Sequence, residues 1–198
     1  MENLARTTAY LAKIASRRTS LRDLLVPLLP PGSRFVWEIG CGHGHFLNAF
    51  AAAHPGRLCL GLDIVRDRIE RATRKRDRAR LDNLHFFLAE AGDFFGALPP
   101  DTAPELIYIL FPDPWPKRRH HKNRLMQPEF LHSIATRAGQ GTSLHFRTDY
   151  EPYFRETEAT LLAHPDWRLA PGAPWGFEHE TVFQSRAPTH FSLVAQRV

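Results

Sequence analysis

The sequence predicts an α/β fold: a mostly parallel sheet with helices on both faces and an antiparallel strand near the C-terminus. Three observations lead to this prediction. Short apolar runs alternate with helical segments, the pattern of parallel strands joined by crossover helices. A glycine-rich turn follows the first apolar run. An acid closes each of five predicted strands, at Glu38, Asp63, Glu90, Asp113 and Asp149. Because parallel strands end at one edge of a sheet, these acids are expected to line one rim, where ligands bind.

Length and composition bound the class of protein. The 198 residues suit one domain over residues 1–198. The formal net charge of +5 favours a polyanionic partner. Only two cysteines are present, without a CxxC pair, so we expect a cytoplasmic protein with neither a disulfide framework nor a zinc module. No apolar run approaches the roughly 18 residues that a membrane span needs, and no membrane partner is expected.

The first 31 residues are expected to form an N-terminal extension. Residues 1–19 are polar and basic and form either a helix or a mobile arm. Ser20 is expected to cap a helix over residues 21–29, which the Pro-Pro-Gly run at 30–32 would end.

The first predicted strand, residues 35–37, leads into E-I-G-C-G-H-G-H-F at Glu38 to Phe46. A glycine-rich turn between a strand and a helix admits a nucleotide close to the backbone. A dinucleotide fingerprint would need a third glycine where His45 stands. An acid beside a G-x-G-x-G turn resembles instead the first motif of S-adenosylmethionine-dependent methyltransferases, whose cationic sulfonium ligand tolerates a carboxylate. Cys41, His43 and His45 do not have the spacing of a common metal site, so no metal is expected.

The second and third predicted strands also end in acids. Asp63 closes the strand over 58–62 and lies 19 residues after Gly44. At about this spacing an α/β cofactor fold places the carboxylate that binds a ribose diol. The alternative is that Asp63 caps the next helix. Glu90 follows the third strand and is expected near an adenine ring, with Asp93 as the alternative.

The helix expected over residues 65–80 is strongly basic. From Arg66 to Arg80 it carries eight Lys or Arg residues against three acids, beside a thin apolar stripe. Such a run is most often a solvated face. The alternative is a second surface that faces RNA.

The most distinctive stretch runs from Phe111 to Leu125 and reads F-P-D-P-W-P-K-R-R-H-H-K-N-R-L. It follows the fourth strand. Its three prolines exclude helix and sheet pairing, which predicts a stiff, extended loop. One carboxylate, Asp113, is followed by five cations between Lys117 and Arg124. This order is typical of a catalytic edge beside a polyanion, and the alternative is a solvated proline-rich loop. Trp115 either stacks on a base or packs locally.

The remaining segments complete the predicted sheet. A helix is expected over 127–137 and a fifth strand over 143–147, followed by a helix over about 153–163. Residues 166–169 and 190–196 are expected to form two last, antiparallel strands.

Four motifs together resemble the bacterial tRNA (guanine-N7-)-methyltransferases of the TrmB type. They are E-x-G-x-G-x-G-x-F at 38–46, F-P-D-P-W-P-K-x-R-H-x-K-x-R-L at 111–125, T-D-x-E-P-Y at 148–153 and T-x-F at 181–183. The resemblance implies a Rossmann-like S-adenosylmethionine-dependent methyltransferase fold. It also implies methyl transfer from S-adenosylmethionine to N7 of a guanosine in the variable loop of tRNA, by a monomer or a homodimer. A non-catalytic RNA-binding protein on this fold, and a methyltransferase for another RNA or a small molecule, stay open as alternatives.

The same resemblance assigns the site residues. The catalytic residue would be Asp113. The residues that hold S-adenosylmethionine would be Glu38, Gly40, Gly42, Asp63, Glu90 and Asp113. The residues that contact the tRNA would be Lys117, Arg119, His120, Lys122, Arg124, Asp149, Thr181, Phe183 and Gln184. Gln184 stands where the family usually has Glu, so the expected substrate pocket lacks one charge.

Overall fold

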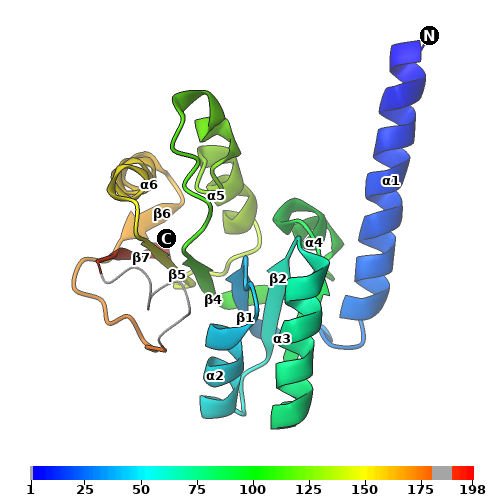
Figure 1. Cartoon of the computed structure of the whole chain (residues 1–198), viewed down its shortest axis with the longest axis horizontal. Coiled ribbons are helices and arrows are strands. Elements are labelled where there is room, and N and C mark those ends of the chain that lie inside the picture. The colour runs from blue at the N-terminus through cyan, green and yellow to red at the C-terminus, as the bar shows by residue number, and fades with distance from the viewer. Residues whose placement is uncertain (1, 180–188) are drawn as a thin grey trace.

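A seven-stranded sheet crosses the molecule in the order β3-β2-β1-β4-β5-β7-β6 (Figure 1). The computed structural model describes residues 2–179 and 189–198. The parallel strands are β1 (Arg34–Ile39), β2 (Cys59–Asp63), β3 (Leu84–Leu88), β4 (Ala103–Leu110) and β5 (Ser143–Thr148). Two antiparallel strands, β6 (Trp167–Leu169) and β7 (Phe191–Arg197), close the edge beyond β5. The predicted fold class, including the two antiparallel strands, is confirmed.

Helices cover both faces of the sheet (Figure 1). One face carries α2 (His45–Ala53) and α3 (Arg66–Ala79). The other carries α1 (Glu2–Leu25), α4 (Ala91–Ala97), α5 (Pro128–Ala135) and α6 (Glu151–Ala163). A short 3₁₀ helix, η1 (Arg118–Asn123), interrupts the loop after β4.

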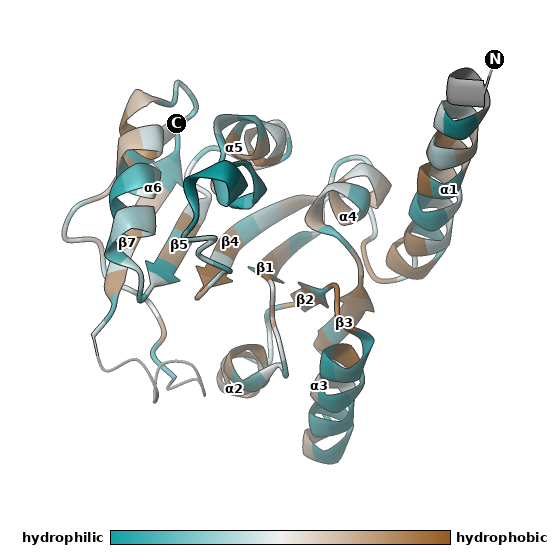
Figure 2. Cartoon of the chain, turned by 45° about the horizontal axis from the view of Figure 1, so that its top comes forward, coloured by the Kyte–Doolittle hydropathy of each residue, from teal (hydrophilic) through white to brown (hydrophobic). Residues whose placement is uncertain are grey.

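The central strand β1 shows why two layers of helices are needed. Its side chains alternate between the faces, because successive residues of a strand point in opposite directions. Phe35 and Trp37 are fully buried in the core beneath α1, α4, α5 and α6, and the Trp37 ring stacks on Phe94 of α4 at 5.4 Å. Val36 is buried in the second core, beneath α2. In Figure 2, β2 and β3 are mostly hydrophobic, whereas most of α3 is hydrophilic.

The N-terminal helix differs from the prediction. α1 is continuous from Glu2 to Leu25, so the segment up to residue 19 is helical and Ser20 lies inside the helix instead of capping one. The helix ends at Leu25 and not at residue 29, because Pro27 disfavours a helical conformation in the residue before it and lacks a backbone N–H. Leu21 and Leu25 are buried in the core that includes α4, and the N-terminal half of α1 projects from the body.

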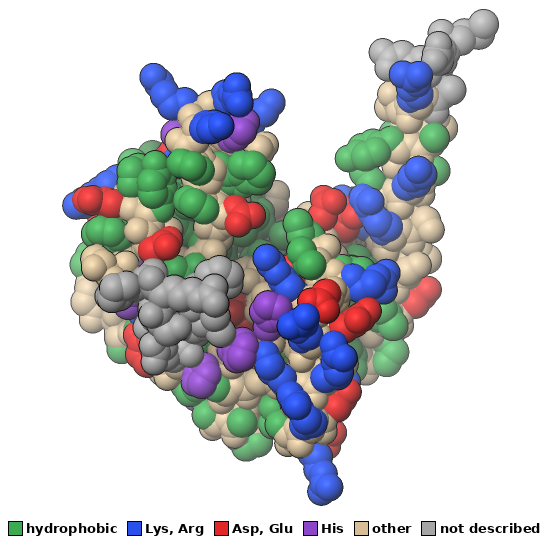
Figure 3. Space-filling model, in the orientation of Figure 1, with side chains coloured by type: hydrophobic (Ala, Val, Ile, Leu, Met, Phe, Trp, Pro, Cys, Tyr) green, Lys and Arg blue, Asp and Glu red, His purple; other side chains and the backbone are tan. Residues whose placement is uncertain are grey.

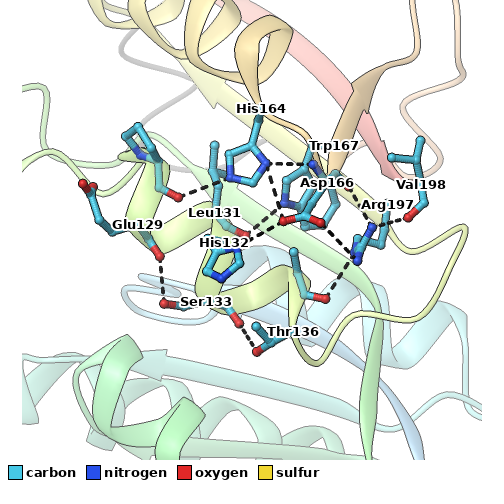
Figure 4. Close-up of polar contacts among 12 residues, drawn as sticks. Glu129, Leu131, His132, Ser133, Thr136, His164, Asp166, Trp167, Arg197 and Val198 are labelled. Carbon is cyan, nitrogen blue, oxygen red and sulfur yellow. Dashed lines mark hydrogen bonds and ion pairs between the residues drawn. The ribbon is translucent and has the colours of Figure 1, made fainter.

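A polar cluster around Asp166 fastens the antiparallel strands to α5 (Figure 4). The Asp166 carboxylate pairs with Arg197 at 3.3 Å and lies 3.2 Å from His132 Nδ1. The Trp167 indole N–H donates to the Leu131 carbonyl at 3.0 Å. These contacts hold β6 and β7 beside β5, whose C-terminal end leads to Asp149.

Candidate functional site

The five parallel strands end at one edge of the sheet, and the two central ones, β1 and β4, are neighbours there although β2 and β3 separate them in the sequence. Such a switch in strand order opens a crevice for ligands. Glu38 from β1 and Asp113 from the loop after β4 line one pocket there, of about 160 Å³, together with Gly40, Gly42 and Arg68. The rim thus brings together a buried and an exposed acid from different strands.

Two of the remaining three predicted acids, Glu90 and Asp149, lie outside this pocket. Glu90 lies in a second pocket of about 450 Å³ at the end of β3, which also has Ile64 and Leu88 in its lining and is walled by α1. Asp149 is exposed beyond β5 on the opposite side and lines neither pocket. Asp93, the alternative to Glu90, is buried in ion pairs with Arg17 at 2.7 Å and Arg18 at 3.4 Å. Asp93 therefore fastens α4 to α1, while Glu90 is exposed.

The turn after β1 is shaped by its glycines. Gly40, Gly42 and Gly44 have φ angles of 77°, 53° and 69°, in the left-handed region that L side chains rarely adopt. At Gly44 a side chain would also collide, because an added Cβ would lie 2.7 Å from Ala72 Cβ and 2.7 Å from the Phe86 ring. The turn therefore packs directly against α3, and its backbone is open to a ligand.

Glu38 is the most unusual group in the pocket. Its side chain is 3% exposed, and Oε2 has no hydrogen-bond partner within the part of the chain that the structure describes. Burial and, to a lesser extent, the Asp63 carboxylate raise the pKa of Glu38 to about 8, although a hydrogen bond from the Leu47 backbone acts in the opposite direction. A buried carboxyl oxygen without a hydrogen-bond donor is costly, so this group suits a cationic or hydrogen-bond-donating ligand.

Asp63 is engaged on both oxygens. Oδ1 accepts a hydrogen bond from Val65 N–H at 2.8 Å, and Oδ2 accepts one from Gly42 N–H at 3.0 Å. Arg68 lies 3.4 Å from Oδ2 and lines the same pocket as Glu38. Asp63 therefore organises both the glycine turn and the start of α3. Arg68 was not predicted from the sequence. The sequence feature that could have identified it is its position in the first turn of the helix that follows Asp63.

The loop that carries Asp113 is bent at both ends. Phe111 and Trp115 have positive φ angles of 50° and 44°, which are uncommon for bulky residues and cost conformational energy. Phe111 N–H donates to the Arg147 carbonyl at 2.8 Å, so the strand pairing of β4 with β5 continues to the first bend. Trp115 is half-buried and packs edge-on to His120, with ring centroids 5.7 Å apart. Asp113 is exposed on this braced loop.

The expected RNA-contacting residues separate into exposed and buried ones. Lys117, Arg119 and Lys122 are exposed around η1, and His120 is half-buried beside them. Arg124 is 2% exposed, and its guanidinium pairs with Glu156. The expectation that Arg124 contacts RNA is therefore corrected, because its side chain is enclosed by the protein.

The remaining predicted residues cannot be placed. Thr181, Phe183 and Gln184 lie outside the residues that the structure describes.

In the ranges 2–179 and 189–198 no group of His, Cys, Asp and Glu residues is arranged to hold a metal ion. No helix in these ranges is both long and apolar enough to cross a bilayer.

The pocket fits the methyl donor of this fold class. The backbone of the glycine turn is accessible, Glu38 is a buried acid whose Oε2 has no hydrogen-bond partner among the described residues, and the second pocket has apolar walls beside Glu90. A sulfonium compound with a polar amino-acid end and a purine end matches both pockets in charge and in polarity. Strand order and site together define an S-adenosylmethionine-dependent methyltransferase.

Comparisons with known proteins give the family. A family profile described as "Putative methyltransferase" matches residues 33–191. A tRNA (guanine-N(7)-)-methyltransferase of Alkalilimnicola ehrlichii is 34% identical over 155 residues, which cover 76% of this chain and 65% of that protein. One from Synechococcus sp. is 34% identical over 174 residues, covering 81% of this chain and 73% of that protein. The chain belongs to the tRNA (guanine-N7-)-methyltransferase family.

Solved structures agree on the fold. TrmN from Thermus thermophilus superposes with a TM-score of 0.60 at 15% identity, covering 91% of this chain and 48% of that one. An rRNA methylase from Streptococcus thermophilus gives 0.56 at 11% identity, covering 91% and 93%.

Proposed function

We propose that this chain transfers a methyl group from S-adenosylmethionine to N7 of a guanosine in the variable loop of tRNA. The observation that carries the proposal is that Glu38, a buried acid with an unsatisfied Oε2, and Asp113 line the same pocket beside a cationic loop. The relatives are tRNA (guanine-N(7)-)-methyltransferases, which supports the same activity. The proposal treats residues 1–198 as one domain with an N-terminal extension. It places the protein in the cytoplasm, a reducing compartment that suits two free cysteines. It also treats the protein as a monomer or a homodimer.

The donor is assigned to the two pockets at the rim. Gly40 and Gly42 would let it approach the backbone, and Glu38 would face its cationic end. Asp63 would meet the ribose from beneath the turn, and Glu90 would lie at the purine end. S-adenosylmethionine, when bound, supplies an electrophilic methyl group on a sulfonium sulfur.

Methylation at N7 requires little proton transfer by the protein. Guanine N7 carries a lone pair and no proton, so no general base is needed to prepare it. The methylated base is cationic, and the protein must therefore position the base and stabilise positive charge as it develops. Asp113 suits this role, because a carboxylate can accept hydrogen bonds from guanine N1–H and the exocyclic amine, and these strengthen as the ring becomes cationic. Asp149 would contact the same nucleoside from β5.

The tRNA backbone is assigned to the exposed cations after Asp113. Lys117, Arg119 and Lys122 are solvent-exposed at η1, where they can neutralise phosphates. His120 completes this surface, which is held next to the pocket by the proline-braced loop.

Nucleoside analysis of tRNA tests the proposed function directly. Unmodified tRNA is incubated with the protein and S-adenosylmethionine. One portion is digested to nucleosides and another to oligonucleotides, and both are analysed by liquid chromatography and mass spectrometry. We expect 7-methylguanosine to form only when protein and donor are both present, and to map to the variable loop. A protein that binds tRNA and donor without forming this nucleoside would refute the activity.

Donor binding at pH 7 is expected to release a proton from Glu38. Its raised pKa of about 8 keeps most of the free protein protonated at this position, and a bound cation would lower that pKa. Calorimetry in buffers of different ionisation enthalpy should detect the release of up to about one proton. Donor affinity should rise as the pH increases toward 8 and then level off.

Glu38→Gln is the control for this prediction. The amino group of the donor titrates in a similar range, and this contribution remains in the variant, so the readout is the difference between the two proteins. Equal proton release by parent and variant would show that Glu38 does not ionise on binding.

Binding of tRNA is expected to depend steeply on salt through η1. Replacing Arg119 and Lys122 with Ala should flatten the plot of log K against log salt by about 1.4–1.8, because each lost phosphate contact contributes about 0.7–0.9. The measurement is fluorescence anisotropy of labelled tRNA at several salt concentrations. A parental slope in the variant would remove η1 from the RNA-binding surface.

A further inference from the structure

Helix α3 and the residue that follows it, Arg80, carry the excess positive charge of the chain. Residues 66–80 contain eight Lys or Arg residues and three acids, a net charge of +5 that equals the formal net charge of all 198 residues. The rest of the chain is therefore neutral in total. A surface that binds a polyanion is expected to stand out in this way.

Four of the eight cations in residues 66–80 share one flank of α3. The spacing of Arg68, Arg71, Lys75 and Arg78 places them along one flank, since residues three and four apart share a face. We call these four residues the α3 stripe. Glu70 and Asp77 fall on the other flank by the same geometry. At a rise of 1.5 Å per residue the stripe is about 15 Å long.

The α3 stripe faces the donor pocket. Lys75 Nζ donates to the His43 carbonyl at 2.8 Å and lies 2.8 Å from His45 Nε2, and both histidines line the pocket that contains Asp113. Arg68, the first residue of the stripe, lines the pocket itself. The stripe thus begins at the site and leads away from it along α3.

The cations of the stripe are crowded and only partly neutralised. Arg68 pairs with Asp63 at 3.4 Å and Arg71 with Asp67 at 2.9 Å, whereas Lys75 and Arg78 have no acidic partner among the described residues. Burial lowers the pKa of Lys75, and repulsion from Arg78 and Arg71 lowers it further. An anionic ligand on this flank would relieve that repulsion.

Two basic surfaces therefore lie on either side of the reaction pocket. Figure 3 shows a row of Lys and Arg side chains over α3 with histidines beside it, and a separate group over η1 at the top of the view. The residues of η1 follow Asp113 in the chain, while Arg68 of α3 lines the same pocket as Asp113. A nucleic acid whose base enters the pocket would meet cations in both directions.

We propose that the α3 stripe binds the phosphate backbone of the tRNA, on the side of the pocket opposite η1. The inference rests on the proposed function and extends it: the substrate lies across the pocket and is held at both ends. The functional reason is that two separated backbone contacts fix the direction of the RNA strand as well as its affinity, and thereby present one nucleotide to Asp113.

The test compares two charge-matched double variants. Arg71→Gln with Arg78→Gln removes two exposed cations of the stripe and spares Arg68 and Lys75, which make contacts inside the site. Arg155→Gln with Arg168→Gln removes two exposed cations from α6 and β6, at the opposite edge of the sheet. Net charge falls equally in both.

Affinity for tRNA is measured between 50 and 200 mM salt, and methyl transfer at saturating tRNA. For the stripe variant we expect the plot of log K against log salt to be less steep than that of the parent by about 1.4–1.8. The ratio of the parental affinity to the variant affinity should therefore be about 7–12-fold smaller at 200 mM than at 50 mM salt. The KM for tRNA should rise while kcat at saturation stays near the parental value. The control variant should keep the parental slope.

The outcomes separate this inference from the function on which it rests. If the stripe and control variants behave alike while the parent methylates tRNA, α3 is a solvated face and only the inference fails. If the parent neither binds nor methylates tRNA, the proposed function itself fails.

Discussion

Asp113→Asn is expected to slow methyl transfer by about 10²–10³-fold, the usual loss when one preorganised electrostatic partner of a transition state is removed. The amide can still accept a hydrogen bond, but it cannot offset the positive charge that develops on the guanine ring. Because Asp113 is exposed on a loop braced by Pro112 and Pro114, the fold should be unaffected. The measurement is a single-turnover rate at saturating donor and tRNA.

Three controls make this result specific. The melting temperature reports folding, and equilibrium binding reports affinity for the donor and for tRNA, which should stay close to parental. Asp149→Asn is the matched variant, since Asp149 is also an exposed acid at a strand end. A variant at position 113 that folds, binds both ligands and transfers methyl at the parental rate would move the catalytic role to Asp149.

Arg124→Ala is expected to destabilise the protein by about 3 kcal/mol, at the lower end of the range for breaking a buried ion pair because Glu156 is partly exposed. The guanidinium also donates to the Pro114 carbonyl at 2.9 Å and lies 4.9 Å from the centre of the Tyr153 ring. Its removal leaves a buried gap and unpaired acceptors. For a chain of this size the loss corresponds to a fall of about 6–12 °C in Tm.

Arg119→Ala is the matched variant for this measurement. Arg119 is exposed on η1, so its removal should weaken tRNA binding with little change in Tm. If Arg124→Ala instead leaves the Tm unchanged and weakens tRNA binding, Arg124 contacts RNA as the motif implies.

Most of the sheet could be predicted from the sequence, because its signals are local. The apolar runs of β1 to β5, the glycine turn at Gly40 to Gly44 and the acids that close the strands each depend on a few neighbouring residues. Parallel pairing then follows from the helical crossovers, which is why the rim was predictable before any contact was known. The N-terminal helix was predictable only in part, since Pro27 ends it and Ser20 has no effect on where it begins.

Side chains from a single sequence motif can differ in burial, and the tertiary structure decides which of them are exposed. Arg119 and Arg124 lie in one basic run, yet only Arg124 is enclosed, by Glu156 and Tyr153 from α6. Its burial depends on residues about thirty positions away, and the run itself contains no sign of it.

The sequence by itself determined the fold class, the position of the glycine turn and the acid on the proline-rich loop, since these follow from periodicity and local backbone chemistry. The tertiary structure decided which acids share a pocket, that Asp63 is held by both the turn and α3, and which flank of α3 faces the site. Those properties depend on distances between elements far apart in the chain. Only the packing of α2 and α3 against the sheet brings Lys75 to His43 and places a basic flank beside Asp113.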